Sequence, residues 1–349
     1  MQFRKAKRTV TTFAVAALAL FVSATYLQAA QWADQDILID AQTLEKQIDN
    51  PDWVVIDCRD LKDYIKGHIP GAISLGKKCK QAFRDPTVKV WQDPQWYENF
   101  LGKVGIGNDT TVVLYHEGIK TVHHSGVGFW VMEWLGHDNG KTKVLNGGID
   151  AWRKDGNRLS QRPTKKPEKT FKVNIVPSRL ATTDEILRIA TGAQQGVQLI
   201  DSRTKKEHTG AVQYGLRGGH VPNTILHVDH KETVQRVKDP KTGKMKPTGY
   251  LVPEVLEEKF GHLDRNTRTI GYCQTGTRSS LTYLELRLLG FKDPANWDDS
   301  WRVWSSNYQD YPVEAPNGEQ WVNFKSIFGD LKKLKKKVAK LEDQLSAKK

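Results

Sequence analysis

The 349-residue sequence contains few cysteines and few long hydrophobic runs. Its three cysteines are Cys58, Cys79 and Cys273, so at least one thiol has no partner within the chain. Only one long run lacks charged residues, residues 10–30, which excludes a protein that crosses a membrane many times. Hydrophobic residues make up 38% of the chain and charged residues 27%, which excludes a disordered chain. The length predicts about two globular domains.

Acidic residues are scarce at both ends of the chain. The formal charge is +13, of which residues 1–30 carry +4 and residues 330–349 carry +5, leaving +4 for the rest. A nucleic-acid-binding protein carries its basic residues on the folded body. The distribution therefore predicts no nucleic-acid partner.

Residues 1–30 are typical of an export signal. Four basic residues precede the uncharged run, and small residues lie at two imperfect cleavage points, after Ala24 and after Ala30. The run is also long enough to remain as a membrane anchor, although its Thr, Ser, Tyr and Gln residues favour cleavage. We therefore expect a periplasmic or extracellular protein, possessing either a cleaved signal or an N-terminal anchor.

An internal repeat organises the chain. Residues 54–59 (VVIDCR) and 67–73 (GHIPGAI) recur as 198–203 (QLIDSR) and 219–225 (GHVPNTI). In both halves, short apolar runs alternate with longer helical patterns, which predicts parallel strands with helical crossovers. The fold class is therefore α/β with two similar domains. The stretch 160–178, which begins with a segment rich in proline and lysine, is the expected linker.

Cys273 lies where a nucleophile is expected. It follows the predicted strand 268–272 and precedes a helix that begins near Ser279, at the sheet edge where ligands bind. Inward-pointing N–H groups, the helix dipole and Arg278 would favour thiolate over thiol, and the same loop would hold an anionic substrate. The intervening loop residues are Gln274, Thr275, Gly276 and Thr277. The alternative is that Cys273 is simply a small buried hydrophobic residue.

These motifs resemble the rhodanese superfamily, and their duplication is similar to the tandem-domain thiosulfate and 3-mercaptopyruvate sulfurtransferases. The resemblance covers about residues 35–315, and the Cys273–Arg278 loop is its specific marker. It implies a non-catalytic first domain, 35–159, a catalytic second domain, 179–315, and an active site facing the groove between them. It implies no cofactor. Cys273 would take a sulfane sulfur from thiosulfate or a related donor and pass the persulfide sulfur to a thiol or cyanide.

The first half supports a silent first domain, because His116 stands at the position that matches Cys273. Asp201 and His220 have counterparts in that silent half, so we expect them to be structural. Arg203 has a counterpart too, but its charge could also face a substrate anion. The loop has four residues between Cys273 and Arg278, whereas phosphatases of related fold have five. A non-enzymatic sulfur carrier or binding protein is the alternative from another class.

The substrate is less well defined. The family resemblance places a basic residue four positions after Arg203, where this sequence has Glu207, and a carboxylate there would repel thiosulfate. Lys205, Lys206 or Arg217 would have to supply the missing positive charge. Polysulfide, a protein persulfide or another chalcogen donor therefore stays open.

Two further groups of residues could carry chemistry. Histidines 116, 123, 124 and 137 could bind a metal, but no Cys-x-x-Cys pair or carboxylate ligand accompanies them, so we expect no metal site. Cys58 and Cys79 could form a disulfide if their Cα atoms come within about 7 Å. The position of Cys58 in the repeated strand-end motif instead favours a buried, unpaired thiol.

The last segment, 316–349, is expected to form a basic helix. Apolar residues recur at heptad-like spacing, and lysines fill much of the remaining surface. The helix would self-associate, lie on a membrane surface, or stay docked or solvated as a single helix. The apolar positions are Phe324, Ile327, Leu331, Leu334, Val338, Leu341 and Leu345.

Overall fold

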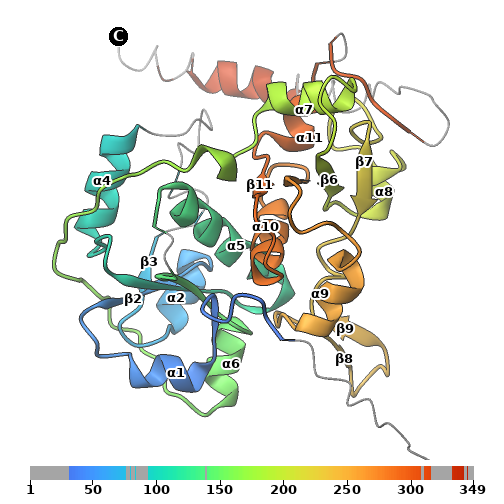
Figure 1. The fold of residues 1–349 in the computed structure, drawn as a ribbon. Helices are drawn as coiled ribbons and strands as arrows, with labels where there is room; N and C mark the ends of the chain where they lie inside the picture. The colour runs from blue at the N-terminus through green and yellow to red at the C-terminus, as the bar shows by residue number, and fades with distance from the viewer. Residues whose placement is uncertain are drawn as a thin grey trace, which may run out of the picture.

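The computed structural model describes residues 31–75, 79, 83, 93–137, 140–307, 310–315, 332–341 and 344. It contains two α/β domains side by side, each built on a parallel sheet with helices packed against it (Figure 1). The predicted fold class is therefore confirmed. The export segment, residues 1–30, lies outside the described residues.

The first domain has a five-stranded parallel sheet in the order β1-β5-β4-β2-β3. Of the central strands, β4 is fully buried and β2 is buried except at Trp53, which matches their near-continuous apolar sequence. Its elements are β1 (Leu38–Ile39), α1 (Ala41–Lys46), β2 (Trp53–Asp57), α2 (Leu61–Lys66), β3 (Ile73–Ser74), α4 (Pro94–Lys103), β4 (Thr111–Tyr115), α5 (Gly118–Trp134), β5 (Thr142–Leu145) and α6 (Gly148–Lys154).

The second domain repeats this plan with a four-stranded parallel sheet in the order β11-β10-β6-β7. An antiparallel hairpin, β8-β9, projects from it (Figure 1). Its elements are η1 (Pro177–Arg179), α7 (Thr183–Ala190), β6 (Gln198–Asp201), α8 (Lys205–His208), β7 (Thr224–His227), β8 (Arg236–Lys238), β9 (Met245–Pro247), α9 (Pro253–Phe260), β10 (Thr269–Tyr272), α10 (Ser279–Leu288), β11 (Pro294–Asn296) and α11 (Ser300–Trp304).

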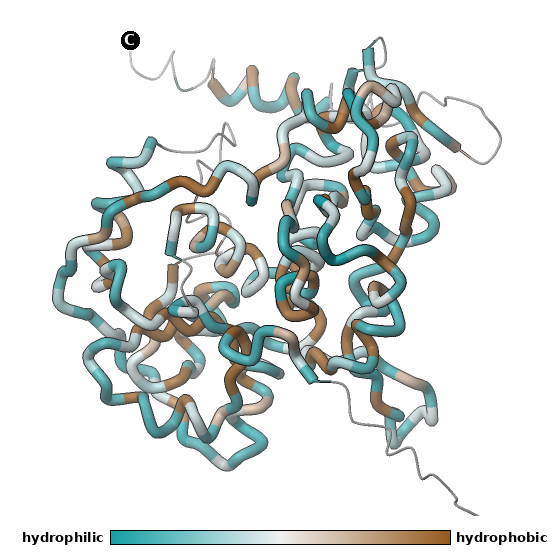
Figure 2. Tube along the Cα trace, in the orientation of Figure 1, coloured by the Kyte–Doolittle hydropathy of each residue, from teal (hydrophilic) through white to brown (hydrophobic). Residues whose placement is uncertain are grey.

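The two domains meet through α5 and α10, which lie together at the centre of the molecule (Figure 1). Gly126 allows the close approach, since a Cβ there would lie only 2.9 Å from the backbone nitrogen of Leu281. Hydrophobic residues are concentrated along the strands and these two helices (Figure 2). Glu133 of α5 adds a polar link by pairing with Arg287 of α10 at 3.0 Å. Burial of apolar surface therefore joins the halves into one body.

The connecting segment and the tail lie at the surface. Ser160 pairs with His68 in a short bridge, and residues 174 and 176 bond to backbone carbonyls at the end of α5. Residues 332–341 form a helix that is exposed throughout, while the apolar positions Phe324, Ile327, Leu331 and Leu345 lie outside the described residues. Among the described residues, no helix is long and apolar enough to cross a membrane.

Cys58 and Cys79 form a disulfide, with their Cα atoms 5.1 Å apart. The expectation that Cys58 is an unpaired thiol is therefore wrong. Burial of Cys58 after β2 was foreseen correctly, but Cys79 is buried beside it, and burial does not exclude pairing. Cys273 is left as the free thiol of the three cysteines.

Candidate active site

Cys273 begins the loop between β10 and α10 and is 1% exposed. Its backbone N–H donates to the hydroxyl of Ser300 at 3.1 Å, and its carbonyl accepts from the N–H of Trp301 at 3.0 Å. The next carbonyl, of Gln274, accepts from the N–H of Arg302. The start of α11 therefore fixes the backbone on both sides of the sulfur.

Two backbone conformations shape this loop. Gly276 has a φ of +72°, and a Cβ there would lie 2.4 Å from Oδ1 of Asp298, so a side chain would strain the loop and clash with its neighbour. Ser300 adopts a φ of +53°, which is uncommon for a residue with a side chain. This conformation lets Ser300 donate to the carbonyl of Trp297 and accept from Cys273. The sequence contains no signal for this role of Ser300.

Arg278 closes the loop and pairs with Glu207. Its Nη1 and Nη2 atoms lie 2.7 Å from Oε2 and Oε1 of the carboxylate, a bidentate arrangement. Glu207 is held in turn by Thr204 in the capping box of α8. Glu207, the carboxylate that departs from the expected basic residue, therefore binds the arginine of the Cys273 loop.

The surroundings favour the thiolate of Cys273. Burial raises the pKa of the thiol, but the charge of Arg278 and hydrogen bonds from Ser279 and the Thr275 N–H outweigh it, so the pKa is lowered. The pKa of Arg278 is raised because its pairing with Glu207 and the charge of Cys273 outweigh the cost of burial. A buried thiol with a lowered pKa is equipped for nucleophilic attack.

The other predicted loop residues gather at the same place. Gln274, Thr275 and Thr277 are partly exposed around the sulfur, and Gly276 is buried beneath them. The carbonyl of Gly276 accepts from Nδ2 of Asn296. The loop is therefore anchored to β11 through Gly276.

Arg203 lies in a buried pair instead. Its guanidinium bonds both oxygens of Asp201 and the carbonyl of Gly219, and it stacks 4.4 Å from the ring centroid of Trp301. Arg59 makes the same contacts with Asp57 and Gly67 in the first domain. The repeated Asp-x-Arg motif therefore ties each strand end to its Gly-His-x-Pro segment.

Arg217 is also enclosed. Its guanidinium donates to the backbone carbonyls of residues 304, 305, 307 and 311, and it is 1% exposed. Because burial is not offset by a carboxylate, its pKa is lowered to about 10. The guanidinium donors of Arg203 and Arg217 are therefore engaged by Asp201 and by backbone carbonyls rather than by residues of the Cys273 loop.

The matching position in the first domain contains a fully bonded imidazole. Nδ1 of His116 lies 3.0 Å from the hydroxyl oxygen of Ser125, within hydrogen-bond distance. Its Nε2 lies 2.9 Å from the carbonyl oxygen of Gly249 in the second domain. Burial lowers the pKa of His116 to about 4, so the ring is neutral at physiological pH. His137 likewise uses both nitrogens, with Thr142 and the carbonyl of Thr110. Within the described part of the chain, no three potential ligand residues are arranged to hold a metal.

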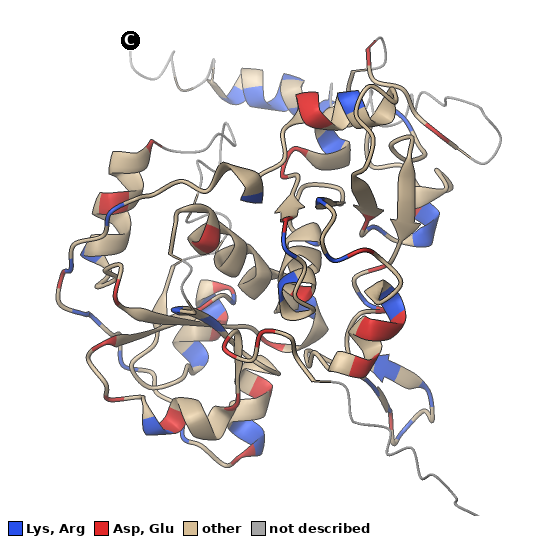
Figure 3. Ribbon diagram, viewed as in Figure 1, with Lys and Arg blue, Asp and Glu red and all other residues tan. Residues whose placement is uncertain are grey.

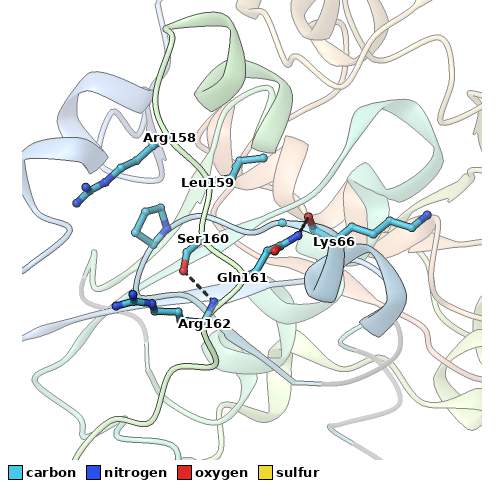
Figure 4. A pocket seen from close by; sticks show the side chains of 8 residues that line it. Lys66, Arg158, Leu159, Ser160, Gln161 and Arg162 are labelled. Atoms are coloured by element: carbon cyan, nitrogen blue, oxygen red, sulfur yellow. Dashed lines mark hydrogen bonds between the residues drawn. The ribbon is translucent and has the colours of Figure 1, made fainter.

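A separate cavity of about 730 Å³ lies in the first domain, where the end of α2 meets residues 158–162. It contains three cationic side chains, but Lys66 and Arg158 extend in opposite directions rather than towards a common point (Figure 4). Gln161 donates to the carbonyl of Lys66 across its wall. Its lining includes none of the Cys273 loop, so it is separate from the candidate site.

The rhodanese-like domain model matches residues 40–155 and 184–307. Thiosulfate sulfurtransferase of Corynebacterium glutamicum is 28% identical over 310 residues, which cover 85% of this chain and 96% of that protein. SseA of Escherichia coli, described as a 3-mercaptopyruvate sulfotransferase, superposes with a TM-score of 0.62 at 22% identity, covering 78% of this chain and 99% of SseA. The anaerobic ergothioneine biosynthesis enzyme of Chlorobium limicola superposes with a TM-score of 0.66 at 19% identity. The match covers 80% of this chain and 70% of that enzyme.

These matches, together with the two parallel sheets and the Cys273 loop, place the chain in the rhodanese-like family. The family resemblance inferred from the sequence is therefore confirmed. Within this family the chain is a sulfurtransferase.

Proposed function

We propose that this protein transfers a sulfane sulfur through a persulfide on Cys273, from thiosulfate or a related donor to a thiol or cyanide. The observation that supports this most is the state of Cys273. It is the free thiol of the three cysteines, and Arg278 and loop N–H groups lower its pKa despite burial. A thiolate that is stabilised in a dry site is a strong nucleophile.

The first half-reaction is a displacement at sulfur. The Cys273 thiolate attacks the outer sulfur of thiosulfate, a sulfur–sulfur bond forms to Sγ, and the original bond breaks as sulfite leaves with its electron pair. The Thr275 N–H and Ser279 would stabilise the anionic sulfur. Arg278 would orient the donor, although Glu207 already compensates most of its charge. That pairing favours donors less anionic than thiosulfate, such as a polysulfide or protein persulfide.

Mass spectrometry of the purified protein tests this proposal. After incubation with thiosulfate or polysulfide, we expect a gain of about 32 Da on Cys273, corresponding to one sulfur atom as a persulfide. The adduct should be absent from Cys273→Ser. If no sulfane donor produces it in the wild-type protein, the proposed mechanism is wrong.

The non-enzymatic sulfur carrier that the sequence left open is disfavoured by the similarity to sulfurtransferases, although the 1% exposure of Cys273 would protect a persulfide as a carrier requires. The two functions differ after loading. An enzyme releases its sulfur to cyanide or a small thiol over repeated cycles, whereas a carrier retains it until a specific protein partner docks. Turnover of several donor molecules per protein would eliminate the carrier.

We further propose that the protein is exported to the periplasm or beyond. The basic and apolar pattern of residues 1–30 supports export, and the Cys58–Cys79 disulfide suits an oxidising compartment. Fractionation followed by intact-mass measurement tests this. A mature chain beginning after Ala24 or Ala30 would establish cleavage, an uncleaved membrane-bound chain would establish an anchor, and a cytoplasmic full-length chain would contradict export.

A further inference from the structure

The two domains place a matching turn beside the residue that follows their central strand. In the second domain, Cys273 directly follows β10, and Ser300 begins α11. In the first domain, His116 directly follows β4, and Gly148 begins α6. In each domain, the strand residue two positions before Cys273 or His116 pairs with the residue four positions before Ser300 or Gly148. Ser300 and Gly148 therefore occupy equivalent positions in the repeat.

The backbone has the same conformation at both positions. The φ angle is +53° at Ser300 and +59° at Gly148, in the left-handed region. In both turns the N–H of the next residue donates to the carbonyl of the residue after the strand, at 3.0 Å for Cys273 and 2.8 Å for His116. The turn is therefore a feature of the repeated fold and does not depend on the presence of a nucleophile.

Glycine is the residue that this conformation favours, because it has no Cβ to clash with the backbone. In the first domain nothing larger fits, since a Cβ at Gly148 would lie 2.1 Å from the carbonyl oxygen of His116. The second domain has Ser300 instead, and a residue with a side chain is strained at this φ. The repeated fold gives no reason for a serine here, so the reason lies in what its side chain contacts.

The hydroxyl of Ser300 binds the backbone around the nucleophile. It accepts from the N–H of Cys273 at 3.1 Å and donates to the carbonyl of Trp297 at 2.6 Å. Ser300 is fully buried, so its hydroxyl does not meet a sulfur donor or acceptor that enters from solvent. A buried N–H without an acceptor is costly, so this bond fixes the orientation of the Cys273 backbone. A glycine at this position would offer no such acceptor.

We propose that Ser300 is a positioning residue for the sulfur chemistry of Cys273: by accepting the Cys273 N–H, its hydroxyl fixes the direction in which Sγ leaves the backbone. The inference rests on the proposed function, because it concerns the reactivity of the same thiol. Arg278, Ser279 and the Thr275 N–H stabilise the thiolate while Sγ lies among them. Without the acceptor, the Cys273 N–H would turn towards another one, and the sulfur would move away from these groups.

Two substitutions separate the hydroxyl of Ser300 from the strain at its backbone. Ser300→Gly removes both and introduces the residue that the first domain uses in the same turn, so we expect it to fold. Ser300→Ala removes the hydroxyl and keeps a side chain at positive φ, so its Tm should lie below that of the glycine variant. A positioning role predicts similar losses of reactivity in both variants. A structural role alone predicts that a folded variant reacts as the wild type does.

The first measurement is the alkylation of Cys273 by iodoacetamide across a pH range, with the full mature chain. We expect the pH midpoint to rise by at least about half a unit in both variants, because the groups that stabilise the thiolate lose contact with it. Ser306→Gly is the matched control, since that hydroxyl is exposed and donates to the carbonyl of Val303 at 2.7 Å. Its profile should coincide with that of the wild type.

The second measurement is the rate of persulfide formation in a single turnover with thiosulfate. The maximal rate should fall by about 10- to 100-fold in both variants, the effect of a misplaced nucleophile. The thiosulfate concentration that gives half of this rate should stay within about threefold, because Ser300 does not reach the donor.

Three results would overturn the proposal. Wild-type alkylation profiles and rates in both variants would exclude any role of the hydroxyl. A loss confined to Ser300→Ala would assign the effect to backbone strain, and a change confined to the half-maximal concentration would assign it to donor binding. Failure of the proposed function is distinguishable, because the wild-type protein would then form no persulfide, while the alkylation profiles would still report the placement of Sγ.

Discussion

Arg278 and Glu207 form a bidentate ion pair in which both distances are 2.7 Å, and the Glu207 side chain is only 4% exposed. The two residues are separated by 71 positions in the sequence. This pair affects both the charge of the Cys273 loop and the position of its arginine. Its consequences for donor choice and for thiol reactivity are measurable separately.

Removing the charge of Glu207 should improve binding of thiosulfate. Glu207→Gln keeps the size and the capping capacity of the side chain but leaves Arg278 uncompensated. One unit of charge near a partly buried anion changes its binding by about 1–2 kcal/mol, so we expect the KM for thiosulfate to fall by roughly 5- to 30-fold. Steady-state assays at low and high salt measure this. Glu232→Gln, at an exposed carboxylate, is the control, and an equal change there would assign the effect to net charge.

Removing Arg278 should raise the pKa of the Cys273 thiol, because the charge of Arg278 is the largest of the effects that lower it. Arg278→Ala/Glu207→Gln avoids leaving an unpaired buried carboxylate. The thiolate fraction at pH 7 should fall, so alkylation by iodoacetamide should slow and its pH midpoint should move upward. Arg278→Lys with Glu207 retained should lie between the two. Superimposable pH profiles would mean that Arg278 does not act on the sulfur.

The sequence predicted the elements whose signals are local. The repeated strand-end motifs, the Cys273 loop and the α10 helix depend on short patterns, and each lies within one or two residues of its expected place. The Cys58–Cys79 disulfide, the carbonyls around Arg217 and the pairing of Arg278 with Glu207 join distant segments. Such contacts depend on how the elements pack in three dimensions, which periodicity and spacing do not specify.

Glu285 should make the protein less stable as the pH rises. Burial in α10 raises the pKa of its carboxyl to about 8, above its value of 4.5 in the unfolded chain. The folded state therefore keeps a proton that the unfolded state loses. The stabilisation is complete below about pH 4.5 and is lost towards pH 8, at up to about 1.4 kcal/mol per pH unit.

Glu285→Gln should remove this contribution, because an amide does not ionise. Thermal unfolding at pH 6 and pH 8.5 should show a smaller decrease in Tm for the variant than for the wild type. Glu258→Gln, at a carboxylate that is 69% exposed, should behave as the wild type does. Parallel Tm changes in all three proteins would contradict the raised pKa.

The helix 332–341 is amphipathic, and its two proposed partners are a second copy of the helix and an anionic membrane. Salt would change binding to these two partners in opposite directions. Leu334, Val338 and Leu341 are about half exposed, and lysines occupy most of the remaining positions (Figures 2 and 3). In an intermolecular coiled coil, apolar burial would hold the helices together, and salt would strengthen association by screening the lysines. On an anionic membrane the lysines provide the attraction, worth about 1 kcal/mol each, and salt would weaken it.

Light scattering and liposome sedimentation at low and high salt distinguish these cases, with a truncation after Asn323 as the control. If the segment drives association, the full mature chain should associate by one of these routes, and the truncated chain should be monomeric and unbound. Mass that increases with salt indicates the coiled coil, whereas sedimentation with anionic vesicles that salt reverses indicates the membrane. A monomer that ignores vesicles with and without the segment would eliminate both routes and leave a single helix that is docked or solvated.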